Sequence, residues 1–242
     1  MIRFYLLIVF NLHLCVRFLV KLKKIIKNID QYDDVFRYNF CRNLIKLINK
    51  KGRITVLSYG QENLPKDDGY VMYSNHQGKY DALGIISTHE RPCRVVIKKN
   101  RGKAILMRQF LEVLGAKKLE VGNLKGSIQL FREVQQELLE GKNYLIFPEG
   151  IFYDNKNTLL EFHTGCMRFL KDVKCPIVPI AIYDTYKVFN VNSLKKVTCE
   201  VHYLDPIYYD EYKELSKPEI AALIKSKIQA KLEERTLFYS VK

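Results

Sequence analysis

The sequence predicts an α/β fold, in which a β-sheet is flanked by helices. Two observations predict it. First, the chain alternates β-branched, aromatic segments with segments of helical periodicity from residue 53 onward. Second, 48% hydrophobic and 27% charged residues over 242 positions are typical of a folded chain that can bury a sizeable core. The predicted strands are 53–59, 70–75, 94–99, 117–121, 143–147, 177–183 and 196–204. The predicted helices are 81–89, 101–114, 125–140, 164–173 and about 218–235.

The first 51 residues differ from the rest in charge and hydrophobicity. They hold eleven lysines or arginines against three aspartates, a net +8 of the chain's +14, and also its most apolar run, 1–24. We expect a helix that lies in or dips into the cytosolic leaflet, with four lysines against anionic headgroups. These are Lys21, Lys23, Lys24 and Lys27. A single membrane span and an ordinary buried helix are the alternatives, whereas a cleaved signal peptide is not expected because the basic cluster follows the apolar part.

A second amphipathic helix is predicted after residue 33. Asp34 can cap its beginning, and Gly52 supplies its end. It could form a membrane-docking hairpin with the first helix, or it could pack on the main domain. We therefore expect two units: membrane-associating helices over 1–51 and an α/β domain over 52–242.

The six cysteines are scattered and show no CxxC or zinc-finger spacing. This pattern favours reduced thiols in a cytosolic compartment over a disulfide framework. A metal site built from His76, Asp81, His89 and His163 has no recognisable ligand spacing. We expect neither a metal nor a cofactor.

The first chemically informative stretch is Asn75-His76-Gln77-Gly78-Lys79-Tyr80-Asp81, which follows a predicted strand. Ligands bind beyond the carboxyl ends of strands in α/β sheets. A turn through Gly78 would let Asp81 hydrogen-bond the His76 imidazole, fix its tautomer and leave the other ring nitrogen as a general base. In the alternative, Asp81 only caps the following helix and His76 is a turn residue. Ser74 lacks the surroundings of a nucleophile elbow.

The second informative stretch is Phe147-Pro148-Glu149-Gly150, again at a strand end. A glutamate between proline and glycine is held on a stiff turn, and the glycine lets backbone approach a ligand closely. By itself this turn is common. Its occurrence one strand–helix–strand stretch after His76 and Asp81 makes it a second candidate part of one site.

Together these blocks resemble the PlsC-like glycerolipid acyltransferases, the 1-acylglycerol-3-phosphate acyltransferase family. A closing block, Pro176–Ile180, fits the resemblance too, which covers about residues 70–185. The resemblance implies a mixed sheet flanked by helices and a membrane location on the cytosolic face. It also implies acyl transfer from acyl-CoA or acyl-carrier protein to a lysophospholipid hydroxyl, by default that of 1-acyl-sn-glycerol-3-phosphate, giving phosphatidic acid.

The resemblance also assigns roles. His76 would be the general base and Asp81 its orienting partner, with no acyl-enzyme. The residues implied to bind substrate are Asn75, Phe147, Pro148, Glu149 and Gly150. The partners implied are the thioester donor, the lysophospholipid and an anionic membrane surface, and no nucleic acid.

Two departures from the family pattern concern the acceptor phosphate. The family commonly continues the second block with Thr-Arg-Ser, where this chain has Ile151-Phe152-Tyr153, and it places an arginine where this chain has Glu120-Val121-Gly122. Substitute cations could come from Lys98, Lys99, Lys117, Lys118 or Lys125. Three alternatives stay open: another lysophospholipid or an aminoacyl-lipid as acceptor, a non-catalytic lipid-binding member of the fold, and, from charge alone, a nucleic-acid binder.

Overall fold

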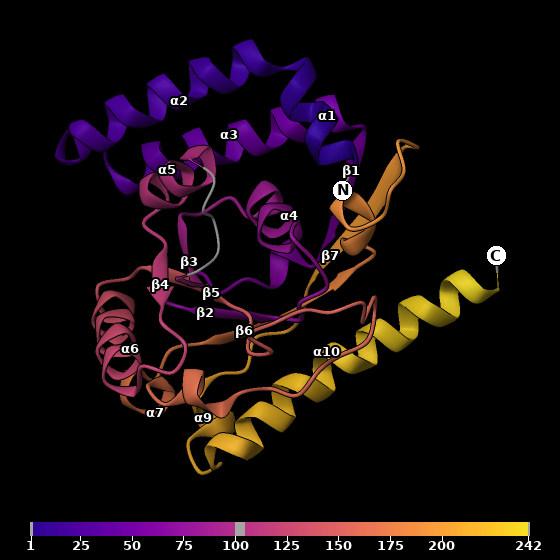
Figure 1. Cartoon of the computed structure of the whole chain (residues 1–242). Coiled ribbons are helices and arrows are strands. Elements are labelled where there is room, and N and C mark those ends of the chain that lie inside the picture. Colours follow the sequence, from indigo (N-terminus) through magenta and orange to yellow (C-terminus); the bar gives the residue numbers. More distant parts are fainter. Residues whose placement is uncertain (1, 100–104, 242) are drawn as a thin grey trace.

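The computed structural model, which describes residues 2–99 and 105–241, contains a seven-stranded sheet between two layers of helices (Figure 1). The strand order is β1-β7-β6-β2-β5-β3-β4. Neighbouring strands are parallel except β6 and β7, which are antiparallel. The predicted α/β class with a mixed sheet is confirmed.

All seven predicted strand segments form strands. Their bounds are β1 Ile54–Tyr59, β2 Val71–Ser74, β3 Cys93–Lys98, β4 Lys117–Leu119, β5 Asn143–Ile146, β6 Ile177–Tyr183 and β7 Val197–Tyr203. The β5 and β6 segments are buried along their whole length, as expected for central strands that are covered on both faces.

The five helical segments predicted for the sheet domain are helical, with changes at their ends. They are α4 Asp81–Thr88, α5 Ile105–Val113, α6 Leu124–Leu139, α7 Leu170–Val173 and α10 Lys217–Ser240. Two short helices, α8 Tyr186–Phe189 and α9 Tyr209–Tyr212, were not predicted. Residues 101–104 of the predicted 101–114 helix lie outside the described residues. The predicted 164–173 helix is a 3₁₀ turn, Thr164–Met167, followed by α7. Helix α10 begins at a capping box of Ser216 and Glu219.

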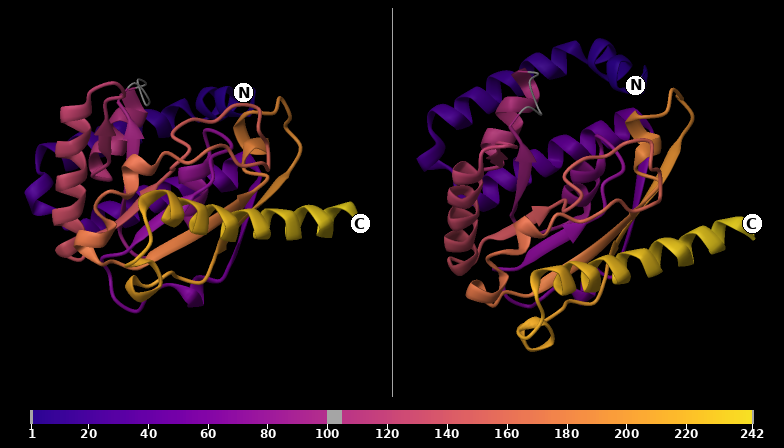
Figure 2. Two further views of the ribbon diagram at one scale, coloured as in Figure 1. Left: turned by 90° about the horizontal axis from the view of Figure 1, so that it is seen from below. Right: turned by 60° about the horizontal axis from the view of Figure 1, so that its bottom comes forward.

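The two faces of the sheet carry separate hydrophobic clusters. Val71 and Tyr73 of β2 pack with α6, α7 and α10, whereas Met72 packs with α2, α3, α4 and α5. This division follows from the alternation of side chains along a strand. Figures 1 and 2 show the corresponding layers, with α6, α7, α9 and α10 on the side of the sheet away from α2 and α3.

The apolar N-terminal run forms two helices where one was predicted. Helix α1 (Ile2–Phe10) and helix α2 (Leu12–Lys27) meet at Asn11 with a bend of 81°. The Asn11 side-chain amide donates to the Leu7 carbonyl at 3.0 Å, a local hydrogen bond that competes with the helical one. Within the described residues, no single helix has the length and hydrophobicity to cross a membrane, and only this bent pair meets both criteria together.

Helix α3 (Asp34–Gly52) packs on the sheet domain, which was one of its two predicted arrangements. Tyr38, Cys41 and Ile45 are buried in the same cluster as Met72. The prediction that Asp34 caps this helix is wrong: Asp33 is the cap, and its carboxylate accepts from the Phe36 amide at 2.7 Å. Asp34 is instead the first helical residue.

Candidate active site

Both candidate blocks leave the same edge of the sheet. Strands β2 and β5 are parallel neighbours, with Tyr73 opposite Ile146, so the segments that follow them emerge side by side. The His76 ring stacks on Phe147, with centroids 4.5 Å apart. The expected meeting of the two blocks at one carboxyl-end edge is therefore present in the fold.

The turn through Gly78 brings His76 to Asp81. The imidazole Nδ1 lies 2.7 Å from Asp81 Oδ2, and the same oxygen accepts from the amides of Gln77 (2.5 Å) and Gly78 (2.8 Å). Asp81 is fully buried and begins α4. It therefore closes the turn and orients the imidazole at once, so the two interpretations of its role are not exclusive.

A proton on Nδ1 leaves Nε2 of His76 as the basic nitrogen. The His76 side chain is 20% exposed, and Nε2 has no hydrogen-bond partner among the residues that the structure describes. A Cβ at Gly78 would lie 3.0 Å from the Asn190 side-chain amide, so a larger residue here would require that amide to shift. That amide in turn donates to the Gln77 carbonyl.

Glu149 is tied to backbone on both sides. One carboxylate oxygen accepts from the His76 amide at 2.9 Å and the other from the Leu160 amide at 3.1 Å. The residue is 1% exposed, and burial raises its pKa to about 7 against these two hydrogen bonds. Glu149 thus links two segments through hydrogen bonds: the turn that contains His76 and the loop that contains Leu160.

Asn75 has a similar structural environment. Its side chain exchanges two hydrogen bonds with the backbone of Ile182 in β6, at 3.1 and 2.8 Å. Ser74 donates to the Asn75 carbonyl and is fully buried. Of the five residues predicted to bind substrate, Asn75 and Glu149 contact the protein's own backbone, and the other three line a cavity. Those three are Phe147, Pro148 and Gly150.

This cavity has a volume of about 650 Å³ and contains His76 in its lining. Its apolar walls come from α4, β3 and α5, including Leu83, Ile86, Val95 and Phe110. We call it the His76 cavity. Its volume and apolar lining are those of a site that can hold an aliphatic ligand.

Basic residues line the His76 cavity as well. Lys98 was among the predicted substitutes for the missing arginines, whereas Lys79, His163 and Arg168 were not. A weak sequence signal marks the last two. His163 lies within Phe162–Gly165, a stretch that also fits the family resemblance, and Arg168 lies three residues after it. Arg168 is exposed and has no ion pair among the described residues.

The remaining candidate lysines lie elsewhere. Lys99 pairs with Glu120 at 3.0 Å, and Lys117 pairs with two glutamates of α6. Lys118 lines a different cavity, and Lys125 lies exposed in the first turn of α6. Of the five candidates, only Lys98 lines the His76 cavity as the structure describes it.

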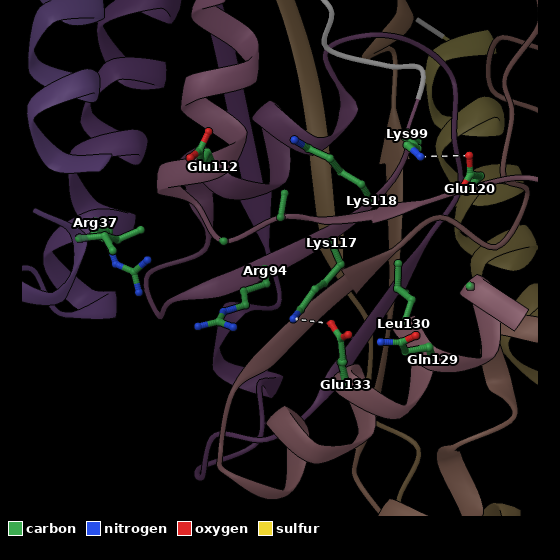
Figure 3. A pocket seen from close by; sticks show the side chains of 14 residues that line it. Arg37, Arg94, Lys99, Glu112, Lys117, Lys118, Glu120, Gln129, Leu130 and Glu133 are labelled. Atoms are coloured by element: carbon green, nitrogen blue, oxygen red, sulfur yellow. Dashed lines mark hydrogen bonds and ion pairs between the residues drawn. The ribbon is translucent and has the colours of Figure 1, made fainter. Parts of the chain in front are cut away.

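The different cavity, of about 570 Å³, lies beside β4 between α3, α5 and α6 (Figure 3). We call it the β4 cavity. Two of its cations have carboxylate partners: Arg94 bonds Asp34 and Glu137, and Lys117 bonds Glu133. These charges compensate one another, and no histidine is among the described residues that line the β4 cavity.

His89, another candidate ligand, lies at the end of α4 opposite Asp81. It is fully buried, its Nε2 is 2.6 Å from the Tyr70 hydroxyl, and burial lowers its pKa to about 4. No group of three or more histidine, cysteine or acidic side chains within the described residues has a metal-binding arrangement. All six cysteines, each within the described part of the chain, are free.

Comparison with known proteins fits this geometry. A family model described as "Acyltransferase" matches residues 55–183, just over half of the chain. The 1-acyl-sn-glycerol-3-phosphate acyltransferase of Saccharomyces cerevisiae is 28% identical over 155 residues, covering 58% of this chain and 51% of that protein. The enzyme of the same name from Borreliella burgdorferi is 26% identical over 197 residues, covering 79% and 77%.

The fold has a close structural neighbour. The crystal structure of the 1-acyl-sn-glycerophosphate (LPA) acyltransferase PlsC from Thermotoga maritima superposes with a TM-score of 0.77, at 17% identity and 97% coverage of both chains. The present chain spans about half the length of the yeast relative. The family model covers both candidate blocks. The chain belongs to the acyltransferase family, the PlsC-like family that its NHQGKYD and FPEG blocks predicted.

Proposed function

We propose that this chain transfers a fatty acyl group from an acyl thioester to the free hydroxyl of a lysophospholipid. The donor is acyl-CoA or acyl-carrier protein, and the default acceptor is 1-acyl-sn-glycerol-3-phosphate, which gives phosphatidic acid. The observation that carries the proposal is the His76–Asp81 pair, whose histidine lines a largely apolar cavity. The 1-acyl-sn-glycerol-3-phosphate acyltransferase names of the relatives support the choice of acceptor.

The chemistry needs one base. His76 Nε2 takes the proton of the acceptor hydroxyl as its oxygen attacks the thioester carbonyl carbon. Collapse of the tetrahedral intermediate breaks the carbon–sulfur bond, and the leaving thiolate takes the proton back from the imidazolium. Asp81 holds the imidazole and stabilises its charged form, while the cavity holds the acyl chain beside it. No bond between the acyl group and the protein is required.

Lys98, with Arg168, would bind the acceptor phosphate. The Lys98 Cε lies 3.8 Å from the place where a Cβ on Gly150 would be, so the Lys98 side chain lies beside the second block, and both residues line the His76 cavity. Cation–phosphate hydrogen bonds are the strong, charge-assisted kind. Phe152 stands where the family pattern has arginine, and its ring packs edge-on against His76 with centroids 4.6 Å apart. These two cations would therefore replace the guanidinium that the second block lacks.

The helices α1 and α2 would hold the protein at the cytosolic face of an anionic membrane. Their exposed side chains include Val9, Phe10, Leu12, Val16 and Val20, each at least 53% exposed. The four predicted lysines of α2 are exposed too. Exposed apolar and basic groups on one bent helix pair favour a lipid surface over nucleic acid.

Acyl transfer by purified protein in mixed micelles would test the proposal. Mass spectrometry of products from a panel of lysolipids, with both donor types, identifies the acceptor. We expect His76→Ala and Asp81→Asn to lower turnover by about 10²–10⁴, with Lys118→Met in the β4 cavity as a matched control. Equal rates in wild type and both variants would contradict the mechanism.

The departure at Phe152 favours one second candidate, a non-catalytic lipid-binding member of the fold. It predicts that liposomes bind the wild type through residues 1–28 but that no donor yields a product. Product formed only from an uncharged or aminoacyl-lipid acceptor would keep the chemistry and change the acceptor.

A further inference from the structure

One threonine contacts the catalytic pair from a distant part of the chain. Thr185 lies just after β6 and immediately before α8, and it is fully buried. Its hydroxyl lies 2.7 Å from Asp81 Oδ1 and 3.0 Å from the Gln77 side-chain oxygen. It belongs to neither of the two sequence blocks that define the site.

The two carboxylate oxygens of Asp81 have different hydrogen-bond donors. Oδ2 accepts from the His76 ring and from two backbone amides. Oδ1 has the Thr185 hydroxyl as its one hydrogen-bond donor within the described residues. Since Asp81 is fully buried, no solvent replaces this donor if it is removed.

The Gln77 amide shows where the hydroxyl proton of Thr185 goes. Its Nε2 donates to the Ile182 carbonyl at 2.8 Å, and a carbonyl can only accept, so the amide orientation is fixed. The Gln77 oxygen therefore faces Thr185 as a second acceptor. A hydroxyl has one proton, and it points to the nearer acceptor, the Asp81 carboxylate oxygen at 2.7 Å.

We propose that Thr185 is a positioning residue that holds Asp81 in the rotamer in which Oδ2 reaches His76. Threonine suits this task because its β-branched side chain has few rotamers, so the hydroxyl direction is set by packing. Thr185 would thereby fix the imidazole through Asp81 without touching substrate. This inference rests on the proposed function only where it predicts an effect of Thr185 on turnover.

The central variant is Thr185→Val, which keeps the shape and removes the hydroxyl. We expect kcat to fall about tenfold with little change in KM, because a buried carboxylate oxygen loses its donor and the pair loses its alignment. Thr185→Ser keeps a hydroxyl and should retain most of the activity. Thr185→Ala is the second hydroxyl-free variant if the valine variant unfolds at the assay temperature.

A double-mutant cycle separates positioning from general packing. If Thr185 acts through Asp81, then Thr185→Val should cost less than twofold in the Asp81→Asn background. A tenfold loss in both backgrounds, or an equal loss in the serine and valine variants, would overturn the proposal.

A readout without turnover keeps this inference distinct from the proposed function. The His76 Nδ1 proton that faces Asp81 should give a downfield NMR signal in the resting wild type and in Thr185→Ser, and a weakened signal in Thr185→Val. The same signal in all three would also overturn the proposal. If the wild type makes no product from any donor, the proposed function fails, and this signal still decides the role of Thr185.

Discussion

The two cavities of this protein are similar in volume and different in chemistry. In the β4 cavity, four of the lining cations have carboxylate partners within hydrogen-bonding distance: Arg37, Arg94, Lys99 and Lys117. The His76 cavity has mainly apolar walls, a base whose Nε2 faces no protein acceptor in the described structure, and lysine and arginine side chains in its lining. Cavity volume therefore does not distinguish a reactive site. A polar group without a hydrogen-bond partner inside the protein does distinguish such a site, since it can still bind a ligand.

The largest difference in kcat/KM between the two cavities should come from placing a tryptophan in each of them. Ala82→Trp in the His76 cavity is expected to lower kcat/KM by more than about 100-fold, because a displaced acyl chain misplaces the reacting carbon. Ala116→Trp in the β4 cavity should change it less than about threefold if the fold is kept. Steady-state acyl transfer, with thermal melts as the control for folding, measures both. Similar losses of kcat/KM in the two variants would contradict the assignment of the acyl chain to the His76 cavity.

The next largest effect is expected from Glu149→Gln. The amide NH₂ of glutamine would face a backbone N–H, so either the His76 or the Leu160 amide loses its acceptor. A cost of about 2 kcal/mol corresponds to a roughly 30-fold loss of transfer through the displaced His76. Wild-type rates in this variant would show that the carboxylate does not hold the turn.

Glu149 also predicts a pH dependence of stability. Its folded-state pKa of about 7 lies above its ordinary value of 4.5, so the folded protein keeps a proton that the unfolded chain releases. The free energy of unfolding should therefore fall as pH rises from about 4.5 to about 7, by up to roughly 3 kcal/mol from this group. Denaturant titrations of wild type and Glu149→Gln would isolate this contribution. It is contradicted if the two proteins show the same pH dependence.

A smaller effect on transfer is expected from removing the charge of Lys98, which lines the His76 cavity. Lys98→Met should raise KM for a phosphate-bearing acceptor about tenfold and leave kcat nearly unchanged, because it removes one charge-assisted contact. Lys118→Met, a matched change in the β4 cavity, should leave KM as in the wild type. Equal KM values in both variants would place the acceptor phosphate elsewhere.

The smallest effect on transfer is expected from Arg94→Met. Arg94 and Glu137 have side chains only 16% exposed, so its loss should lower the free energy of unfolding by about 2 kcal/mol while transfer stays within about twofold. Chemical denaturation and the transfer assay together check this. A large loss of transfer at unchanged stability would give the β4 cavity a functional role.

Particular residues show how far sequence reasoning reached. His76, Asp81 and the second block could be identified because short-range signals mark them. Each block follows a strand and contains a glycine turn, and a helix begins at Asp81. Their meeting depended on β2 and β5 being parallel neighbours, which the strand ends made a reasonable expectation. The N-terminal run was predicted as one helix because it is apolar on both sides of Asn11. The bend at Asn11 occurs together with a local side-chain hydrogen bond to Leu7, which the hydrophobic pattern does not reveal.

The sequence by itself determined the α/β class, the seven strands and the candidate pair of His76 and Asp81, since alternation, turn residues and local spacing are properties of neighbours along the chain. Only the tertiary structure decided that Glu149 faces backbone amides, that Lys98 and not Lys117 reaches the cavity, and that Thr185 meets Asp81. These outcomes depend on contacts between residues up to 104 positions apart. Such contacts are set by strand order and helix packing, and no local pattern specifies them.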